Sequence, residues 1–246
     1  MKILQLNVWT GRLKGALERF VRENEADVIC MQEAVWSEDS PATVNYAFDS
    51  VDKLMAAGNY KYDYRTANFA VRIGDNCLMK QGNVIISKIP FTEAKSTFVG
   101  GTAYTETPDL ANGGDQIYSA QKVVLNNGLV LVNHHGFWST DPLGDERHIK
   151  CMREVADMFR DEKRPVIMCG DLNVISESPA MRELDFMRDL TSEYGIKQTL
   201  QNLKFVKDVA CDHVLINDKI IVKDYHTVDQ LASDHKAVFT EIELKD

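Results

Sequence analysis

The sequence predicts a single α/β domain whose strands pair mostly antiparallel. Apolar runs of strand length alternate with segments of helical periodicity along the whole chain of 246 residues. Several neighbouring strands are separated by turns too short to hold a helical crossover, which favours antiparallel pairing. No internal repeat, low-complexity tract or linker-like change of composition interrupts the chain. We therefore expect one domain that spans residues 1–246.

The N-terminal half begins as a strand followed by an amphipathic helix. Residues 2–8 form an apolar run of strand length, and Leu13, Leu17 and Phe20 lie on one face of a helix over 12–24. The further elements expected here are a buried strand at 27–31 that ends at Gln32-Glu33, a helix at 43–57, and strands at 60–66, 81–87 and 91–99.

The C-terminal half opens with a β-hairpin. Strands at 117–125 and 129–135 flank Asn126-Asn127-Gly128, which are residues typical of a tight turn. The remaining expected elements are a helix around 149–159, a strand at 165–169, a helical stretch near 179–188, and strands at 213–217, 219–223 and 236–243. Segment 100–116 is expected to be the longest irregular loop.

Composition indicates a soluble, acidic protein. Hydrophobic residues make up 44% of the chain, and 37 acidic residues against 28 basic ones give a formal net charge of −9. No apolar run approaches the ~20 residues that a membrane helix needs. The acidity argues against a protein that holds nucleic acid through a broad basic face. It does not exclude an acidic cleft that meets phosphate through a metal ion.

The cysteines and the first residues favour a reducing, cytoplasmic location. The five cysteines are odd in number and widely spaced, and no C-x-x-C pair occurs among them. This pattern argues against a disulfide framework and against a structural metal site. Residues 2–8 already have the pattern of a strand, which leaves no room for a signal peptide.

The polar residues that stand out share one expected placement, the C-terminal end of an apolar strand. They are Asn7, Glu33, His135, Asp171 with Asn173, and Asp234 with His235. Strand ends that open into loops are where α/β proteins build sites on a rigid scaffold. A single Asp or Asn in such a place is usually a turn residue. The repetition of the pattern favours a functional site.

Oxygen donors dominate this set. Glu33, Asp171, Asp234 and Asn7 offer hard oxygen atoms, which suit Mg²⁺ or Mn²⁺ and are poor ligands for zinc. Cysteine is absent from these positions, and the chain has no H-E-x-x-H motif. The histidines are then available to contact a substrate instead of a metal ion.

Two choices between neighbouring histidines stay open at this point. Along 131–135, period two places Asn133 and His135 on one face of the strand and His134 on the other, so one histidine is expected to be a bystander. The Asp-His dipeptide occurs twice, at 212–213 and at 234–235. The two pairs cannot share one role, and the residue pattern does not choose between them.

Seven short motifs follow one another along the chain. They are L-Q-L-N-V-W around Asn7, Q-E at 32–33, G-N-V-I-I-S-K-I-P at 82–90, N-H-H at 133–135, G-D-L-N at 170–173, C-D-H-V-L at 211–215 and S-D-H at 233–235. In this order they resemble the endonuclease/exonuclease/phosphatase superfamily, which includes apurinic endonucleases, pancreatic-type deoxyribonucleases, neutral sphingomyelinases, inositol-polyphosphate 5-phosphatases and deadenylases. G-D-x-N alone is moderately specific, whereas its combination with the upstream Q-E and the C-terminal S-D-H is strong.

The resemblance implies a fold and resolves both open choices. The implied fold is a DNase I-like, four-layer α/β/β/α sandwich, in which two mixed, mostly antiparallel sheets pack face to face with helices outside. The superfamily's N-x-H motif falls on His135. Its S-D-H motif falls on Asp234 and His235, and its D-x-[VI]-[LF] motif falls on Asp212.

The resemblance also implies a metal-dependent phosphohydrolase that works by in-line attack of water. The implied cofactor is Mg²⁺, with Mn²⁺ as an alternative. Glu33 is implied to be the main metal ligand, helped by Asn7 and Asp234 directly or through water.

Five further residues have catalytic roles by the same resemblance. Asp171 is implied to orient and deprotonate the attacking water, while Asn173 fixes that carboxylate or the phosphate. His235, held by Asp212, is implied to contact the scissile phosphate. His135 is implied to stabilise charge on the phosphorane oxygens or on the leaving group.

Two tryptophans stand close to candidate site residues. Trp9 and Trp138 each follow such a residue by two or three positions. They either pack at the rim of the fold or bind substrate, as an aromatic wall for a base, a sugar or an apolar head group. Trp9 also occupies a position where apurinic endonucleases carry a small polar residue, which sets the chain apart from that subfamily.

The favoured function is hydrolysis of a phosphodiester, with nucleic acid or a nucleotide as the expected substrate class. An alternative is a phosphatase or phospholipase C-type hydrolase of inositol phosphates or sphingomyelin-like lipids. An alternative of another class is a non-catalytic binding module on the same fold. Such a module is expected to lose Glu33, Asp171 or His235, and the chain has all three.

Overall fold

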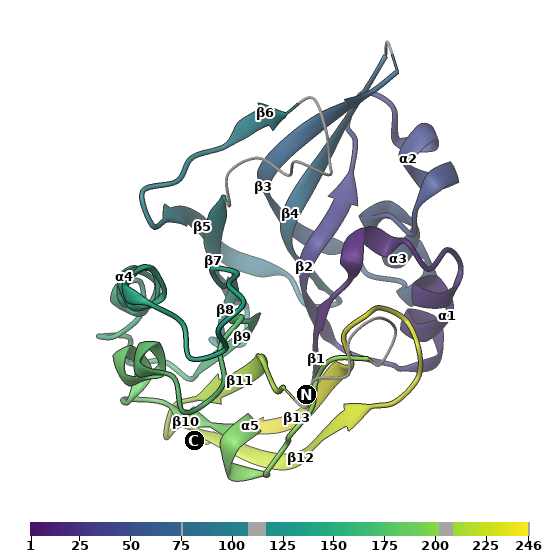
Figure 1. The fold of residues 1–246 in the computed structure, drawn as a ribbon. Helices are drawn as coiled ribbons and strands as arrows, with labels where there is room; N and C mark the ends of the chain where they lie inside the picture. The colour runs from purple at the N-terminus through teal and green to yellow at the C-terminus, as the bar shows by residue number, and fades with distance from the viewer. Residues whose placement is uncertain (75, 108–116, 202–208, 246) are drawn as a thin grey trace.

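Two β-sheets pack face to face in the computed structural model, which describes residues 1–74, 76–107, 117–201 and 209–245 (Figure 1). The first sheet has the strand order β12 (Ile220–Val228), β13 (Ala237–Leu244), β1 (Lys2–Asn7), β2 (Val28–Trp36), β4 (Cys77–Ser87), β3 (Tyr62–Ile73), β6 (Thr105–Thr107). The second has the order β10 (Arg188–Asp189), β11 (Asp212–Ile216), β9 (Val166–Asp171), β8 (Val130–His135), β7 (Tyr118–Leu125), β5 (Phe91–Val99).

Both sheets are mixed, and antiparallel pairing dominates in each. Among the described strands, the parallel pairs are β1 with β2, β3 with β6, and β8 with β9. The hairpin predicted around Asn126-Asn127-Gly128 joins β7 to β8, and Gly128 has the positive φ of 85° that its turn requires.

Helices cover the outer face of each sheet. Helices α1 (Ala16–Glu23), α2 (Pro41–Ala47) and α3 (Val51–Gly58) lie on the first sheet, at the right of Figure 1. Helix α4 (Glu146–Asp157) and the 3₁₀ helix η2 (Pro179–Leu184) lie on the second. The predicted four-layer α/β/β/α sandwich is confirmed.

Period two assigns the strand residues to separate cores. On β1, Leu4 and Leu6 pack against α1 and α3, whereas Ile3 faces the second sheet. On β9, Met168 packs against α4, whereas Ile167 faces the first sheet. The layers follow from this alternation, because each sheet buries both of its faces.

The side chains between the sheets change in kind along each strand. The series are Ile3, Gln5, Asn7 on β1; Leu131, Asn133, His135 on β8; and Ile167, Cys169, Asp171 on β9. Apolar residues thus hold the two sheets together at one end, and ionisable residues gather at the other. Between them lies a set of fully buried amides, called here the amide layer: Gln5, Gln32, Asn83, Gln121 and Asn133.

The helix predicted over 43–57 is wrong, because two helices occupy this segment. Helix α2 ends before Phe48, whose backbone is extended, and α3 begins after Ser50, whose side chain accepts a hydrogen bond from Lys53 N. Ser50 is therefore an N-cap, a signal that the apolar periodicity of the segment obscures.

Other elements also differ from the predicted bounds. The strand expected at 27–31 continues to Trp36, so Glu33 lies inside β2 and not at its end. The helical stretch expected near 179–188 is the short η2 followed by β10. Strand β6 lies within the loop expected at 100–116, and residues 108–116 of that loop are outside the described residues.

The rule that site residues follow strands holds for only part of the set. Asn7, His135 and Asp171 do end their strands. Asp234 and His235, however, precede β13, and Asp212, which was not in that set, is the first residue of β11. The reason is that β11 and β13 run antiparallel to β9 and β1, so their N-terminal ends reach the same edge.

All five cysteines are buried free thiols. Among the residues that the structure describes, no helix combines the length and the apolar composition needed to cross a bilayer.

Candidate active site

The ionisable ends of the strands surround one cavity of about 830 Å³. It is lined by every site residue that the sequence predicts except Asp212, which is fully buried behind His235. Strands of both sheets contribute: Asn7 and Glu33 come from the first sheet, and His135 and Asp171 come from the second. The cavity is therefore a feature of the contact between the sheets.

Asp171 lies at the centre of this arrangement. Its Oδ2 accepts a hydrogen bond from Asn7 Nδ2 at 3.0 Å and lies 3.6 Å from His135 Nε2 and 3.7 Å from His235 Nε2. Its Oδ1 accepts from the backbone N–H of Asn173 at 3.1 Å. Burial raises the pKa of Asp171, but the charges of the two histidines and these hydrogen bonds outweigh it, so that the net shift is downward. Asp171 is thus a carboxylate at neutral pH.

Asp212 and His235 form a hydrogen-bonded pair next to Asp171. His235 Nδ1 donates to Asp212 Oδ2 at 2.8 Å, which leaves Nε2 on the side of Asp171. Burial lowers the pKa of His235, but the carboxylates of Asp212 and Asp171 reverse this effect and raise it well above its ordinary value. The two carboxylates therefore favour the imidazolium form of His235.

Asp212 is hydrogen-bonded by residues outside its own strand. Gln5 Nε2 donates to its Oδ1 at 2.6 Å from β1 of the first sheet. Thr199 Oγ1 accepts from the backbone N–H of Asp212 at 3.2 Å. These contacts fix the carboxylate that orients His235, although Gln5 was not among the predicted site residues. Period two puts Gln5 on the same face as Asn7, which is the signal that identifies it.

The structure places the histidines of the two Asp-His pairs differently. His213 is fully buried and lies outside the cavity lining. Its Nε2 donates to Val174 O at 2.9 Å, and its Nδ1 faces Asp189 Oδ2 at 3.2 Å. His213 therefore supports the segment that follows Asp171 and does not face the cavity.

The two adjacent histidines also separate, as period two predicts. His135 lines the cavity, whereas His134 is fully buried and its Nδ1 donates to Ser119 O at 3.0 Å. His134 Nε2 is buried without a hydrogen-bond partner among the described residues. Burial is the main reason that the pKa of His134 falls to about 4. His134 is thus a neutral structural residue.

We expect His134 to make folding stability depend on pH between its ordinary pKa of 6.5 and its folded value of about 4. Below pH 6.5 the unfolded chain binds a proton at His134 that the folded chain does not bind. The free energy of unfolding therefore falls as pH falls. Between pH 7 and pH 5 this loss amounts to roughly 2 kcal/mol. Urea unfolding of the wild type and of His134→Asn, which keeps an N–H for Ser119 O, measures it. A difference in unfolding free energy that stays constant over this range would contradict the assignment.

The predicted metal ligands lie on the first-sheet side of the cavity. Burial and the charge of Glu33 raise the pKa of Asp234, against the opposing effect of His235. Two mutually repelling carboxylates beside the Asp171 carboxylate form a donor set for a hard divalent cation, which would remove the repulsion. Glu33 and Asp234 therefore fit the metal ion that the resemblance implies.

Asn7 has a different orientation from that of an oxygen ligand. Its Nδ2 donates to Glu33 Oε1 at 3.2 Å and to Asp171 Oδ2 at 3.0 Å, while its Oδ1 accepts from the backbone N–H of Trp9 at 3.0 Å. Ligation through Oδ1 would require the amide to rotate by about 180° and to lose the hydrogen bond from Trp9. In this conformation Asn7 positions the two carboxylates.

A second group of metal-ligating atoms lies deeper. Single ligand atoms of Asp171, Cys211, Asp212 and His235 lie within 4.8 Å of one another. Cys211 directly precedes Asp212 in the chain, and its thiol lies beside the site. Burial and then the charges of Asp171 and Asp212 raise the pKa of the Cys211 thiol strongly, so it stays protonated. Because Asp212 and His235 are already paired, this group is a hydrogen-bonded cluster, and the hard donors Glu33 and Asp234 suit Mg²⁺ better.

Strained backbone concentrates around the cavity. Of the five described non-glycine residues with positive φ, four are Trp9 (46°), Thr10 (58°), Glu33 (55°) and Asn173 (56°). Each such residue costs about 1–3 kcal/mol and persists only where its surroundings hold it. The strain thus marks the turns that aim Trp9, Glu33 and Asn173 at the cavity.

Both predicted tryptophans line the cavity together with residues that the sequence analysis missed. Trp138 is 55% exposed, and its backbone N–H donates to the Tyr118 hydroxyl at 3.0 Å. Tyr118 lines the cavity edge-on to the His135 ring, and its hydroxyl proton has no acceptor among the described residues. Arg12, whose guanidinium lies 5.3 Å from the Trp9 ring centroid, is the only lysine or arginine among the described lining residues. Nothing in the sequence pattern of Arg12 indicates this position.

Comparison with known proteins identifies the family. A family model described as the Endonuclease/Exonuclease/phosphatase family matches residues 4–235. No curated protein matches the chain in sequence.

Solved structures of the same fold cover the whole chain. An endonuclease/exonuclease/phosphatase from Beutenbergia cavernae DSM 12333 has a TM-score of 0.73 and 20% identity, over 100% of this chain and 72% of that chain. A mannosyl-6-phosphatase from Bacteroides thetaiotaomicron VPI-5482 has a TM-score of 0.68 and 13% identity, over 99% of this chain and 100% of that chain. The human Nocturnin catalytic domain with a bound sulfate anion has a TM-score of 0.67 and 13% identity, over 100% of this chain and 93% of that chain. The chain therefore belongs to the endonuclease/exonuclease/phosphatase family, whose members are hydrolases.

Proposed function

We propose that the protein is a Mg²⁺-dependent phosphodiesterase that hydrolyses a nucleic acid or nucleotide by in-line attack of water. One observation carries the proposal: the Asp171 carboxylate lies 3.7 Å from the imidazolium of the His235–Asp212 pair, in a cavity that Glu33 and Asp234 also line. A base, a cation and a hard-metal donor set thus meet at one surface, as phosphoryl transfer requires.

Asp171 is the group that accepts the proton of the attacking water. Its lowered pKa keeps it deprotonated, and the hydrogen bonds from Asn7 and from the backbone of Asn173 hold both of its oxygens. Asn173 is itself fixed by a hydrogen bond from its Nδ2 to Gly136 O at 3.0 Å. The base is therefore oriented before the substrate binds.

The histidines and Tyr118 face the phosphate. His235 donates its Nε2–H to a phosphate oxygen while Asp212 holds the ring and its charge. His135 stabilises charge on the phosphorane or on the leaving group, and the Tyr118 hydroxyl donates beside it. Hydrogen bonds that strengthen as charge develops contribute most to the rate.

Glu33 and Asp234 would hold the divalent cation. Asn7 would lie between the carboxylates of Glu33 and Asp171 and donate one N–H to each. When bound, Mg²⁺ supplies Lewis-acid charge to the phosphate oxygens. Mn²⁺ prefers the same oxygen donors and is the alternative ion.

The shape and charge of the site favour a small or single-stranded substrate. A cavity of about 830 Å³ is the size of a small-molecule site. Trp9 and Trp138 offer faces for a base or sugar, and Arg12 offers a cation for a second anionic group. With a net charge of −9, the protein would hold long duplex nucleic acid weakly.

A substrate panel tests the proposal. Plasmid DNA, single-stranded RNA, nucleotides, sugar monophosphates, inositol polyphosphates and sphingomyelin are each incubated with Mg²⁺ and with EDTA. We expect EDTA-sensitive hydrolysis of RNA or nucleotides. Turnover confined to sugar or inositol monoesters, or to sphingomyelin, would establish the alternative hydrolase. No turnover of any substrate would leave the non-catalytic binding module as the better description.

Replacement of Glu33 tests the metal site. In Glu33→Gln we expect the Mg²⁺ concentration for half-maximal activity to rise by at least ~10-fold, because a neutral amide replaces an anionic ligand. Glu25→Gln, at an exposed position, is the matched control. A Mg²⁺ titration identical to that of the wild type would remove Glu33 from the ligand set.

A further inference from the structure

We propose that Asn133 and Gln121, two buried amides of the second sheet, position Glu33 by completing an interrupted hydrogen-bond ladder in the first sheet. The inference rests on the proposed function, because it takes Glu33 as a metal ligand. Neither amide lines the cavity, so both act through the backbone that carries Glu33.

A β-bulge presents Glu33 to the cavity. Between β2 and β4 the register passes from Met31 opposite Val84 to Ala34 opposite Gly82, so Gln32 and Glu33 together oppose the single residue Asn83. Glu33 has a φ of 55° there, a left-handed conformation that side chains other than glycine rarely adopt. Because of this extra residue, Glu33 does not follow the regular alternation of side chains along β2.

The side chain of Asn133 contacts both strands that form this bulge, β2 and β4. Its Nδ2 lies 3.0 Å from Met31 O and 3.3 Å from Val84 O, the carbonyls of the last regular pair before the bulge. Its Oδ1 accepts from Gln32 Nε2 at 2.6 Å. Carbonyls in an unbroken ladder point at the neighbouring strand, so a side chain from the facing sheet reaches them where the ladder opens.

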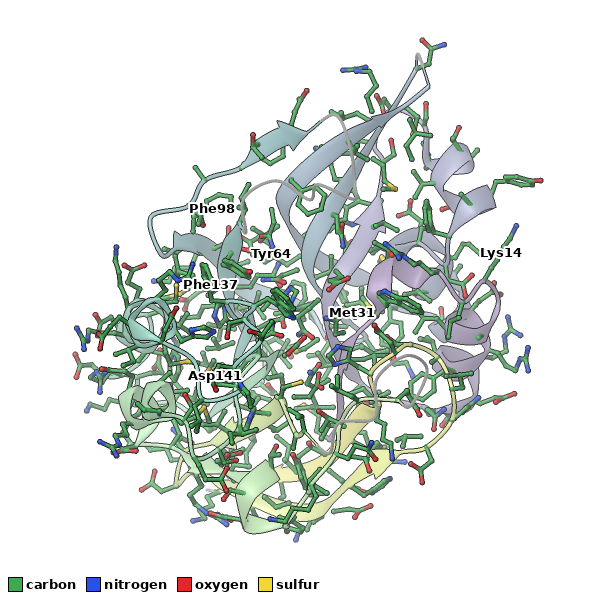
Figure 2. All side chains as sticks on the ribbon, viewed as in Figure 1. Lys14, Met31, Tyr64, Phe98, Phe137 and Asp141 are labelled. Carbon is green, nitrogen blue, oxygen red and sulfur yellow. The ribbon has the colours of Figure 1, made fainter. Side chains whose placement is uncertain are left out.

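Gln121 extends the same support. Its Nε2 donates to Asn83 O at 3.0 Å, on the residue opposite the bulge, and lies 3.0 Å from Tyr64 O on β3. Its Oε1 accepts from Asn133 Nδ2 at 2.9 Å. Figure 2 labels Met31 and Tyr64, two residues whose carbonyls meet this pair of amides.

Burial makes these contacts obligatory. Asn133, Gln121 and Asn83 are fully buried, so no solvent can replace a lost partner of the bulge carbonyls. A residue with a strained backbone keeps that conformation only while contacts with its surroundings hold it there. Loss of either amide is therefore expected to release Glu33 from its position facing the cavity.

Mn²⁺ binding, measured by electron paramagnetic resonance of the free ion, tests the proposal without activity. We expect the Kd of Mn²⁺ to rise ~10–100-fold in Asn133→Ala and in the same direction in Gln121→Met, as for other residues that orient ligands. Ser87→Ala is the control, since Ser87 is an equally buried residue of β4 whose hydroxyl donates to Ile89 O at 2.8 Å and contacts neither the bulge nor the cavity. We expect its Kd for Mn²⁺ to stay within about twofold of the wild type.

The outcomes separate this inference from the proposed function. Glu33→Gln is measured in parallel. If Glu33→Gln weakens Mn²⁺ binding but Asn133→Ala and Gln121→Met do not, the positioning role is wrong and the metal site stands. If Glu33→Gln has no effect, the metal site itself fails. Equal weakening in Ser87→Ala and Gln121→Met would mean general loosening of the core, which overturns the inference. If Asn133→Ala does not fold, the comparison of the Mn²⁺ Kd of Gln121→Met with that of Ser87→Ala decides.

Discussion

Asp171→Asn is expected to lower kcat by ~10³-fold or more on the substrate that the panel identifies, with a smaller change in KM. The substitution keeps the size and shape of the side chain but removes the group that accepts a proton from water. Asn7 Nδ2, which now donates to the carboxylate, would face an amide in its place. The loss is expected mainly in the transition state, because the substrate contacts proposed for His235, Trp9 and Arg12 would remain.

Steady-state kinetics at saturating Mg²⁺ measures this effect. Asp218→Asn, the same substitution at an exposed aspartate, is the control and should keep wild-type kcat. A thermal unfolding midpoint close to that of the wild type shows that the fold is intact. Wild-type turnover in purified Asp171→Asn would exclude Asp171 as the base.

His235→Ala is the second substitution with a large expected effect, again a ~10³-fold loss of kcat. It removes the imidazolium that faces Asp171. It also leaves Asp212 as a buried carboxylate without its charged partner. Breaking a buried pair in this way costs about 3–5 kcal/mol of stability. The variant is therefore compared with Asp212→Asn and with the double variant.

The double variant distinguishes a catalytic pair from two independent groups. If Asp212 acts only by holding His235, the double variant loses little more kcat than His235→Ala alone, because groups that act as a unit are not additive. It should also regain stability relative to His235→Ala, since no unpaired charge stays buried. Losses of kcat that multiply would show that Asp212 has a separate role.

Period two predicted correctly which side chains of a strand share a face near the cavity. It predicted that His134 and His135 lie on opposite faces of their strand, and the structure confirms this, since His135 lines the cavity and His134 does not. It would also have identified Gln5, which shares the inner face of β1 with Asn7. These successes have one cause, which is that the alternation of a strand is a local property of the backbone.

Sequence reasoning failed where neighbouring strands decide the outcome. Glu33 was expected at the end of a strand, whereas a bulge against β4 turns it out of the middle of β2. Asp234 and His235 were grouped with strand ends, although they stand before the start of a strand. In both cases the partner strand is far away in sequence, so no local pattern records it.

The sequence by itself determined the α/β class, the residue chemistry of the site and the family to which the chain belongs. Only the tertiary structure decided that Gln5 reaches Asp212, that Tyr118 and Arg12 line the cavity, and that Asn7 turns its amino group toward the carboxylates. The physical reason is the packing of two sheets face to face. Local alternation fixes which side chains point inward, but the contact between sheets fixes which of them meet.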